Sequence, residues 1–174
     1  LLFVGDGPER STAEDLAKEL GVFDEVRFVG KQEQMEDILA IADLFLLTSE
    51  YESFGLAALE AMAAGVPVIS TNAGGLGEIN VEGVTGYLAD VGDISTMTAK
   101  AISIIKDDTI LNGFKERAAN HAKSFDISRV VPVYEKLYER FLWDKNSKKQ
   151  DTRNKKRTKR QETNLKEIKK REKI

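Results

Sequence analysis

The stretch Thr48–Glu78, TSEYESFGLAALEAMAAGVPVISTNAGGLGE, constrains the fold more than any other part of the chain. An apolar run, Leu44–Leu47, precedes it and a second, Pro67–Ser70, lies within it; residues 54–64 between them are almost all apolar or small. This order is typical of two parallel strands joined by a helix. We expect the helix to be buried on most of its circumference and Leu44–Leu47 to be a central strand covered on both faces.

Two carboxylates in this stretch, Glu52 and Glu60, are separated by seven residues. If the helix begins near Ser53 or Phe54, the N–H groups of Phe54, Gly55 and Leu56 point out of its N-terminus and can bind an anion such as a diphosphate. Glu60 would lie roughly 9 to 12 Å further along, near the reach from a diphosphate to a ribose diol. Glu52 would lie on the other side of the phosphates. Taken alone, such a pair is more often a first-turn acid followed by a surface residue.

Composition describes a soluble globular protein that carries an unusually charged segment. The chain has 174 residues, of which 41% are hydrophobic and 32% are charged, enough for one domain with a sizeable core. It has no apolar run long enough to span a bilayer and no signal peptide, so we expect a cytoplasmic protein. The absence of cysteine excludes disulfides and thiolate chemistry, and the single histidine, His121, argues against a histidine-rich metal site.

Charge divides the chain into an acidic body and a basic tail. Residues 144–174 contain 14 Lys+Arg and 5 Asp+Glu, a net charge of +9, whereas residues 1–143 contain 12 and 24, a net charge of -12. We expect residues 1–143 to form a domain that is truncated at its N-terminus, because the chain opens inside a strand. We expect the tail to be disordered or a single charged helix. Its charge leaves binding to an anionic membrane or to nucleic acid open.

The remaining elements alternate between strands and helices. Further strands are expected at Leu1–Val4 and Val26–Gly30 and, at an edge, within Gly83–Leu88. Five further helices are expected. The first runs from a capping box at Ser11 to Leu20 and is ended by Gly21. The others lie over 35–42, over 94–106 after the cap Asp93, from Asp108 to 123, and after Asp126, where Pro132 is a start or a kink. This alternation predicts an α/β fold with a doubly wound, Rossmann-like parallel sheet.

The runs ESFGLAALEAMAAGVPVIST, NAGGLGE and GVTGYL together resemble the C-terminal, nucleotide-sugar-binding domain of retaining glycosyltransferases of the GT-B fold, in family 4. The resemblance covers residues 1–143 and implies the C-terminal half of a GT-B fold. It implies that Glu52 is catalytic and contacts the donor sugar, and that Glu60 holds the ribose hydroxyls. The other implied donor-binding residues are Ser53, Phe54, Gly55 and Leu56 at the diphosphate, and Gly30 and Lys31 at the base. Gly77 departs from the family, which often has proline there.

The resemblance also implies a reaction. The anomeric configuration is retained, and the leaving diphosphate is stabilised by the helix N-terminus and cations, with no bound metal and no other cofactor. The segments GDGPE and GKQ and the pair Gly92–Asp93 resemble the members that join N-acetylglucosamine to L-malate in bacillithiol synthesis, which implies UDP-N-acetylglucosamine as the donor. In such enzymes the diphosphate-binding Arg and Lys precede the strand that opens this chain, and the acceptor site lies in an N-terminal domain. That domain, and a second copy of the chain, are the expected partners.

Two other classes of function remain open at this stage. A sugar-nucleotide epimerase of the same architecture would share the phosphate-binding helix but would need further acid–base groups, for which the chain offers no candidate. A non-catalytic domain for nucleotide-sugar binding or assembly would keep the fold without transferring sugar. The basic tail would then be the active part, and whether Glu60 matters for nucleotide affinity distinguishes this alternative from a donor site.

Overall fold

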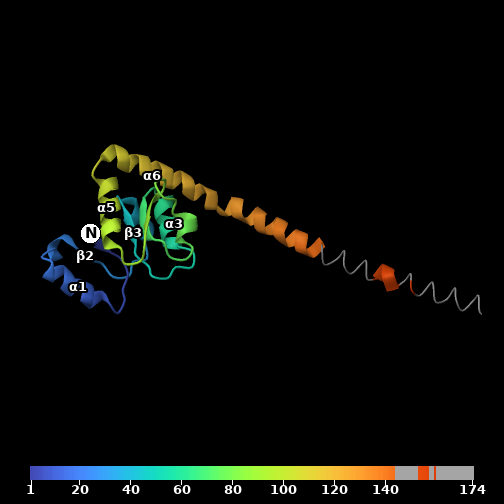
Figure 1. Ribbon diagram of the computed structural model, residues 1–174, viewed down its shortest axis with the longest axis horizontal. Helices are drawn as coiled ribbons and strands as arrows, with labels where there is room; N and C mark the ends of the chain where they lie inside the picture. Colours follow the sequence, from blue (N-terminus) through green and yellow to red (C-terminus); the bar gives the residue numbers. More distant parts are fainter. Residues whose placement is uncertain (144–152, 157–158, 160–174) are drawn as a thin grey trace, which may run out of the picture. The chain divides into compact units, whose positions relative to one another are not determined.

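The computed structural model describes residues 1–143, 153–156 and 159 of the chain (Figure 1). The chain divides into two compact units, Leu1–Lys123 and Ser124–Ile174. The elements of the first unit are, in order, β1 (Leu2–Phe3), α1 (Arg10–Glu19), the short 3-10 helix η1 (Phe23–Glu25), β2 (Arg27–Phe28), α2 (Met35–Ala40), β3 (Phe45–Leu47), α3 (Leu56–Ala63), β4 (Val68–Thr71), α4 (Leu76–Ile79), β5 (Gly86–Ala89), α5 (Ile94–Ile105) and α6 (Asp108–Ala122).

All the strand pairs of the first unit are parallel, which confirms the predicted α/β class with a parallel sheet. β1 pairs with β2, and β3, β4 and β5 form a second sheet in that order. Each parallel connection passes through a helix because both strands must run in the same direction. The loops that follow the strands therefore gather at the carboxyl ends of the sheets, where open α/β folds bind ligands.

The central strand of the larger sheet is β4, and the prediction that Leu44–Leu47 is a central strand covered on both faces is wrong. β4 lies between β3 and β5, and Val68, Ile69, Ser70 and Thr71 are all at most 1% exposed. Within the described residues β3 pairs only with β4, and Leu46 is 42% exposed. The apolar run therefore forms an edge strand. The edge strand predicted within Gly83–Leu88 is confirmed as β5.

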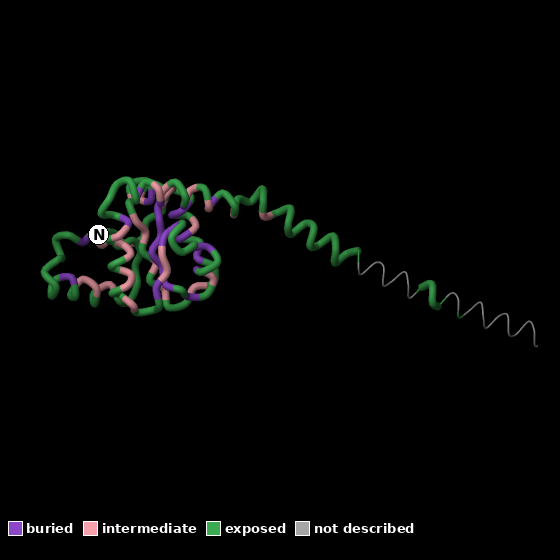
Figure 2. Tube along the Cα trace, turned by 45° about the horizontal axis from the view of Figure 1, so that its top comes forward, coloured by how far each residue is buried: buried purple, intermediate pink, exposed green. Residues whose placement is uncertain are grey.

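The core of the first unit is built around β4 (Figure 2). Ile69 packs against Ile104 of α5 and against Leu111 and Phe114 of α6, and all four side chains are buried. α3 contacts β3, β4, α4 and α6. Because the helices that follow β4 in the chain pack back onto it, the core joins elements that are far apart in the sequence.

A buried asparagine joins the end of α4 to both neighbouring strands. Asn80 is fully buried, and its Nδ2 donates to the carbonyl oxygens of Val68 (3.2 Å) and Tyr87 (3.0 Å) and to Ser70 Oγ (2.9 Å). Its Oδ1 accepts from Thr85 Oγ1 at 2.9 Å. A buried polar side chain with several partners is stable where an unpaired one would not be. Asn80 therefore ties the loop between α4 and β5 to the sheet.

α1 starts earlier than predicted, and α6 starts at the predicted residue but is capped by the aspartate before it. α1 begins at Arg10, and Glu14 Oε1 accepts from Arg10 Nε at 2.8 Å, so the capping box predicted at Ser11 is wrong. α1, which lies between β1 and β2, has Glu9 as its N-cap residue and no capping side chain. α6 begins at Asp108 as predicted, but the capping side chain is Asp107, whose Oδ1 accepts from the Thr109 and Ile110 amides.

Two other predicted helix ends are confirmed. Asp93 caps α5 by accepting from the Thr96 amide at 3.0 Å. Gly21 follows α1 with a φ of +68°, and its N–H donates to the Lys18 carbonyl at 3.0 Å. The left-handed conformation suits glycine, which has no Cβ to clash with the preceding turn.

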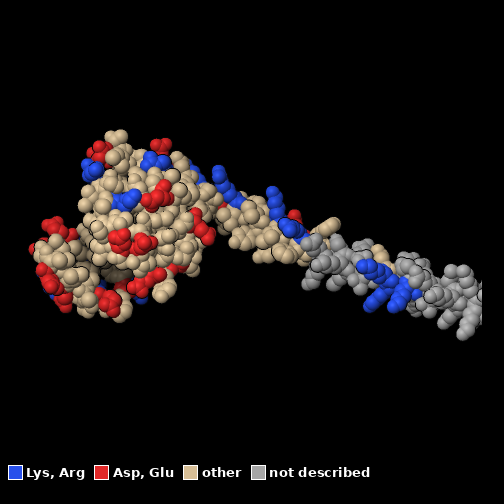
Figure 3. All heavy atoms as spheres, viewed as in Figure 1, with Lys and Arg blue, Asp and Glu red and all other residues tan. Residues whose placement is uncertain are grey.

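The second unit contains a helix over residues 127–143. Asp126 starts it by accepting from the Ser128 amide at 2.8 Å, so Pro132 lies inside the helix and does not start it. Most of the predicted basic tail, 144–174, lies outside the described residues; 153–156 are helical, and their exposed lysines and arginine are drawn in Figure 3. None of the helices in the described part of the chain is long and apolar enough to cross a membrane.

Candidate functional site

The loop between β3 and α3 contains four of the eight predicted site residues, Glu52, Ser53, Phe54 and Gly55. α3 begins at Leu56, with Gly55 as its N-cap, which is later than the start predicted near Ser53 or Phe54. Gly55 has a φ of +94°, and a Cβ at this position would lie 2.6 Å from Cδ2 of Leu76 in α4. Only glycine therefore allows the chain to turn into α3 while packed against α4.

The Glu52 carboxylate lies against the amides that were predicted to bind a diphosphate. Glu52 Oε1 accepts from the backbone N–H of Phe54 at 3.4 Å and from that of Gly55 at 3.2 Å. The side chain thus occupies the N-terminal end of α3, where the helix dipole favours negative charge. This position matches the alternative that the sequence left open, an acid at the start of the helix favoured by the helix dipole, and not the predicted position on the far side of the phosphates.

Two glycines hold the backbone of this loop from behind. The Gly75 amide donates to the Glu52 carbonyl at 3.2 Å, and a Cβ on Gly75 would lie 2.5 Å from the Ser53 carbonyl oxygen. A Cβ on Gly74, whose φ is +53°, would lie 1.7 Å from the Glu52 carbonyl oxygen. Gly74 and Gly75 thus let the backbone of their turn approach the loop after β3 closely.

One side of α3 is buried and the other is exposed, so the prediction of a helix buried on most of its circumference is wrong. Ala58, Ala61 and Met62 are fully buried, whereas Leu56 is 63% exposed and Glu60 is exposed. Ala57 and Ala63 of the same helix are also exposed. Glu60 is consequently available to solvent and needs no buried partner.

Gly30 and Lys31 follow β2 at the carboxyl end of the smaller sheet. Gly30 has a φ of +67°, and its carbonyl accepts from the Gly5 amide at 2.8 Å, so the turns after β1 and β2 lie together. Arg10 supports this corner, because its Nη2 donates to the Phe28 carbonyl at 3.3 Å and its Nε to Glu14. Lys31 is exposed. Sequence reasoning missed Arg10, since nothing local marks a side chain that reaches a carbonyl 18 residues away.

Electrostatics at Arg10 follow from these contacts. The hydrogen bond to Glu14, and the charges of Glu14 and Asp6, raise the pKa of the Arg10 guanidinium above its ordinary value, although desolvation opposes this. The arginine therefore stays charged at every working pH, and its charge is already engaged by carboxylates.

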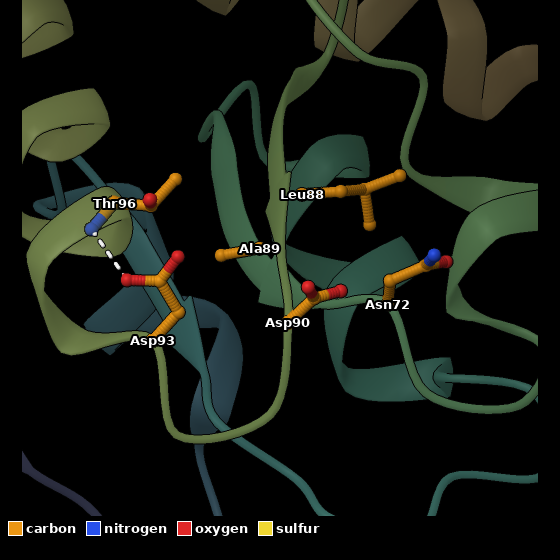
Figure 4. A pocket seen from close by; sticks show the side chains of 6 residues that line it. All are labelled: Asn72, Leu88, Ala89, Asp90, Asp93 and Thr96. Carbon is orange, nitrogen blue, oxygen red and sulfur yellow. Dashed lines mark hydrogen bonds between the residues drawn. The ribbon is translucent and has the colours of Figure 1, made fainter.

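A separate hollow of about 240 Å³ opens at the carboxyl ends of β4 and β5 (Figure 4). The lining residues are Asn72, Leu88, Ala89, Asp90, Asp93 and Thr96. It contains none of the predicted donor-site residues. Two carboxylates border it, and negative charge repels phosphate, so we do not assign a diphosphate to this hollow.

Residues 1–122 match the family described as glycosyl transferases group 1, which is well over half of the chain. The chain belongs to this family. Among curated group 1 relatives, it is 46% identical over 150 residues to the N-acetyl-alpha-D-glucosaminyl L-malate synthase of Bacillus anthracis, covering 85% of this chain and 39% of that protein. It is 35% identical over 130 residues to the 2-deoxystreptamine N-acetyl-D-glucosaminyltransferase of Niallia circulans, covering 74% and 32%. The chain thus spans about two fifths or less of the length of these relatives.

Solved structures show the same fold. Anabaena HepE in complex with UDP superposes with a TM-score of 0.71 at 28% identity, covering 79% of this chain and 40% of that one. The sucrose-phosphate synthase of Thermosynechococcus elongatus superposes with a TM-score of 0.72 at 28% identity, covering 82% and 38%. The group 1 chain therefore has the α/β architecture of known glycosyltransferase structures, as its sequence resemblance implied.

Proposed function

We propose that residues 1–143 form the donor-binding part of a retaining glycosyltransferase. The donor is a nucleotide-diphosphate sugar, UDP-N-acetylglucosamine, and the acceptor is a small molecule, L-malate. Membership of the group 1 family supports transfer, and the named substrates rest on what the most similar relatives are called. We place the reaction in the cytoplasm.

The observation that carries the proposal is the end of α3. The amides of Phe54 and Gly55 both donate to one carboxylate oxygen, Glu52 Oε1, at 3.4 and 3.2 Å. They therefore have the geometry to bind an anion. Glu60 lies on the exposed side of the same helix. An anion site and a carboxylate on one helix suit a diphosphate followed by a ribose.

Each residue has a separate task in this proposal. The amides of Phe54, Gly55 and Leu56 and the hydroxyl-bearing Ser53 hold the diphosphate, and Glu60 accepts hydrogen bonds from the ribose hydroxyls. Positive potential at the helix end stabilises the negative charge that develops as the diphosphate leaves. No metal or other cofactor is part of the proposed site.

The other two site regions contact the two ends of the donor. The proposed role of Glu52 is to contact the transferred sugar, and the turn at Gly30 and Lys31 contacts the base. In this proposal an N-terminal domain, like the part of the relatives outside the match, supplies the acceptor site and the remaining cations. The aligned lengths support this partner, because the relatives extend well beyond the matched region.

Isothermal titration of UDP and GDP into the 174-residue chain tests the donor site. We expect UDP to bind and GDP to bind more weakly. Glu60→Ala should weaken UDP binding by about 10-fold or more, since hydrogen bonds to a charged group contribute about 1.5 to 3 kcal/mol. Glu116→Ala, which removes an exposed carboxylate from α6, is the matched control. UDP affinity that is unchanged in Glu60→Ala would contradict the proposed ribose contact.

A further inference from the structure

The contact between Glu52 and the N-terminus of α3 bears on how the proposed donor site is used. One carboxylate oxygen of Glu52 accepts from both the Phe54 and Gly55 amides. The proposed diphosphate needs the same two donors. A carboxylate and a phosphate cannot share them, because each amide has one proton and the two anions repel each other at such short range.

The backbone around these amides is held in place independently of the carboxylate. Gly74 and Gly75 pack directly on the Glu52 and Ser53 backbone, and the Gly75 amide donates to the Glu52 carbonyl at 3.2 Å. Thr71 Oγ1 donates to the Ser49 carbonyl at 2.6 Å at the start of the same loop. The loop backbone is thus tied to β4 and to the turn that follows it.

Only the Glu52 side chain needs to move to free the amides. Its carboxylate is joined to the fixed backbone by single bonds whose rotamers interconvert rapidly when partly exposed. Glu52 is half-buried, so rotation toward solvent is open to it. The amides would remain in the geometry that binds an anion after the carboxylate leaves.

We propose that Glu52 is an internal competitor for the diphosphate, occupying the α3 amides until a nucleotide displaces it. The inference rests on the proposed donor site and adds a regulation of that site. The same displacement moves the carboxylate off the phosphate position and frees it for the transferred sugar. Affinity for the nucleotide is then reduced by the fraction of molecules in which the amides are open.

Titration of UDP into full-length wild-type, Glu52→Ala and Glu52→Gln chains tests this competition. If the amides are open in roughly a tenth to a fifth of molecules, Glu52→Ala should bind UDP about 5- to 10-fold more tightly. Glu52→Gln keeps a neutral acceptor and should show a smaller gain. Glu50→Ala removes an equal charge two residues away and should leave UDP affinity within about 2-fold of wild type, since exposed charges interact weakly in water.

Two further ligands separate the phosphate contact from the other parts of the donor. Uridine, which has no phosphate, should bind all four chains equally. UDP-N-acetylglucosamine should gain less than UDP in Glu52→Ala, because that variant also loses the proposed sugar contact. Circular dichroism melting of each variant verifies that the loop change has not unfolded the chain.

The outcomes distinguish this inference from the donor-site proposal. UDP affinity that is equal or weaker in folded Glu52→Ala, while Glu60→Ala still loses binding, overturns the competition and leaves the donor site standing. A gain that Glu50→Ala reproduces also overturns it, since net charge would then explain the effect. Absence of UDP binding from wild type and from every Glu52 variant overturns both proposals.

Discussion

At the scale of single residues, Gly74 decides whether the loop after β3 can hold its position. An alanine there would place a Cβ 1.7 Å from the Glu52 carbonyl oxygen at a φ of +53°. We predict that Gly74→Ala lowers the free energy of unfolding by about 3 kcal/mol or more, because both the clash and the backbone strain must be relieved. Urea unfolding followed by circular dichroism measures this loss.

Gly83→Ala is the matched control for that variant. Gly83 has a comparable φ of +72°, but a Cβ there meets no atom within 4 Å. Its cost should be limited to about 1 to 2 kcal/mol of left-handed strain. Equal losses in the two variants would show that the contact with Glu52 contributes nothing.

Asn80 is the second residue whose change should affect the whole unit. Without its side-chain amide, three oxygen atoms of β4 and β5 that are buried or partly buried each lose a hydrogen bond that Asn80 Nδ2 donates. We predict that Asn80→Ala costs about 3 kcal/mol in the free energy of unfolding, since buried groups left unpaired cost about 1 to 3 kcal/mol each and some will be rehydrated. Asn112→Ala on the exposed face of α6 should change stability by less than about 0.5 kcal/mol in the same urea titration. An Asn80 loss as small as that of Asn112 contradicts the prediction.

At the scale of elements, the N-terminus of α5 should make the free energy of unfolding depend on pH in the acid range. Hydrogen bonds from the Thr96 side chain and amide lower the pKa of Asp93 below its ordinary value of 3.8. The folded chain therefore binds this proton less readily than the unfolded chain. The stabilisation from Asp93 is fully present above the unfolded value and is lost as the pH falls through the lower folded pKa.

We predict that Asp93→Asn makes the acid-induced loss of stability shallower while leaving stability near neutral pH almost unchanged. Asparagine caps helices about as well as aspartate, so the cap itself is preserved. Urea unfolding at a series of pH values between about 2.5 and 7 measures the slope. Glu50→Gln is the control for loss of one carboxylate from an exposed loop. An unaltered acid slope in Asp93→Asn would contradict this prediction.

At the scale of the whole molecule, the proposed activity requires more than this chain. Relatives at 46% and 35% identity are matched over 39% and 32% of their length. We predict that the purified 174-residue chain binds UDP weakly and transfers no sugar from UDP-N-acetylglucosamine to L-malate. Mass-spectrometric detection of N-acetylglucosaminyl malate is the assay, with a full-length relative as positive control. Product formed by the chain alone would contradict the proposed division of labour between two domains.

The sequence by itself determined the class of fold, the family and most element positions. Alternating apolar runs and helical segments predicted parallel strands joined by helices, and local signals such as Asp93 and Gly21 were enough to predict helix ends because caps depend on neighbouring residues. The site residues came from the family's motif, and their roles remain predictions. Apolar content alone could not predict that Leu44–Leu47 is an edge strand or that α3 exposes one side, because burial depends on which elements pack together.

Only the tertiary structure decided which distant groups meet. Gly74 and Gly75 are needed because they press on Glu52 and Ser53, and Arg10 matters because it reaches the Phe28 carbonyl. Neither contact leaves a local signal, since each joins residues about 20 positions apart or more by packing. The position of the Glu52 carboxylate on the Phe54 and Gly55 amides was likewise decided by the folded loop, because the turn at Gly55 delays the start of α3 and aims both amides at one oxygen.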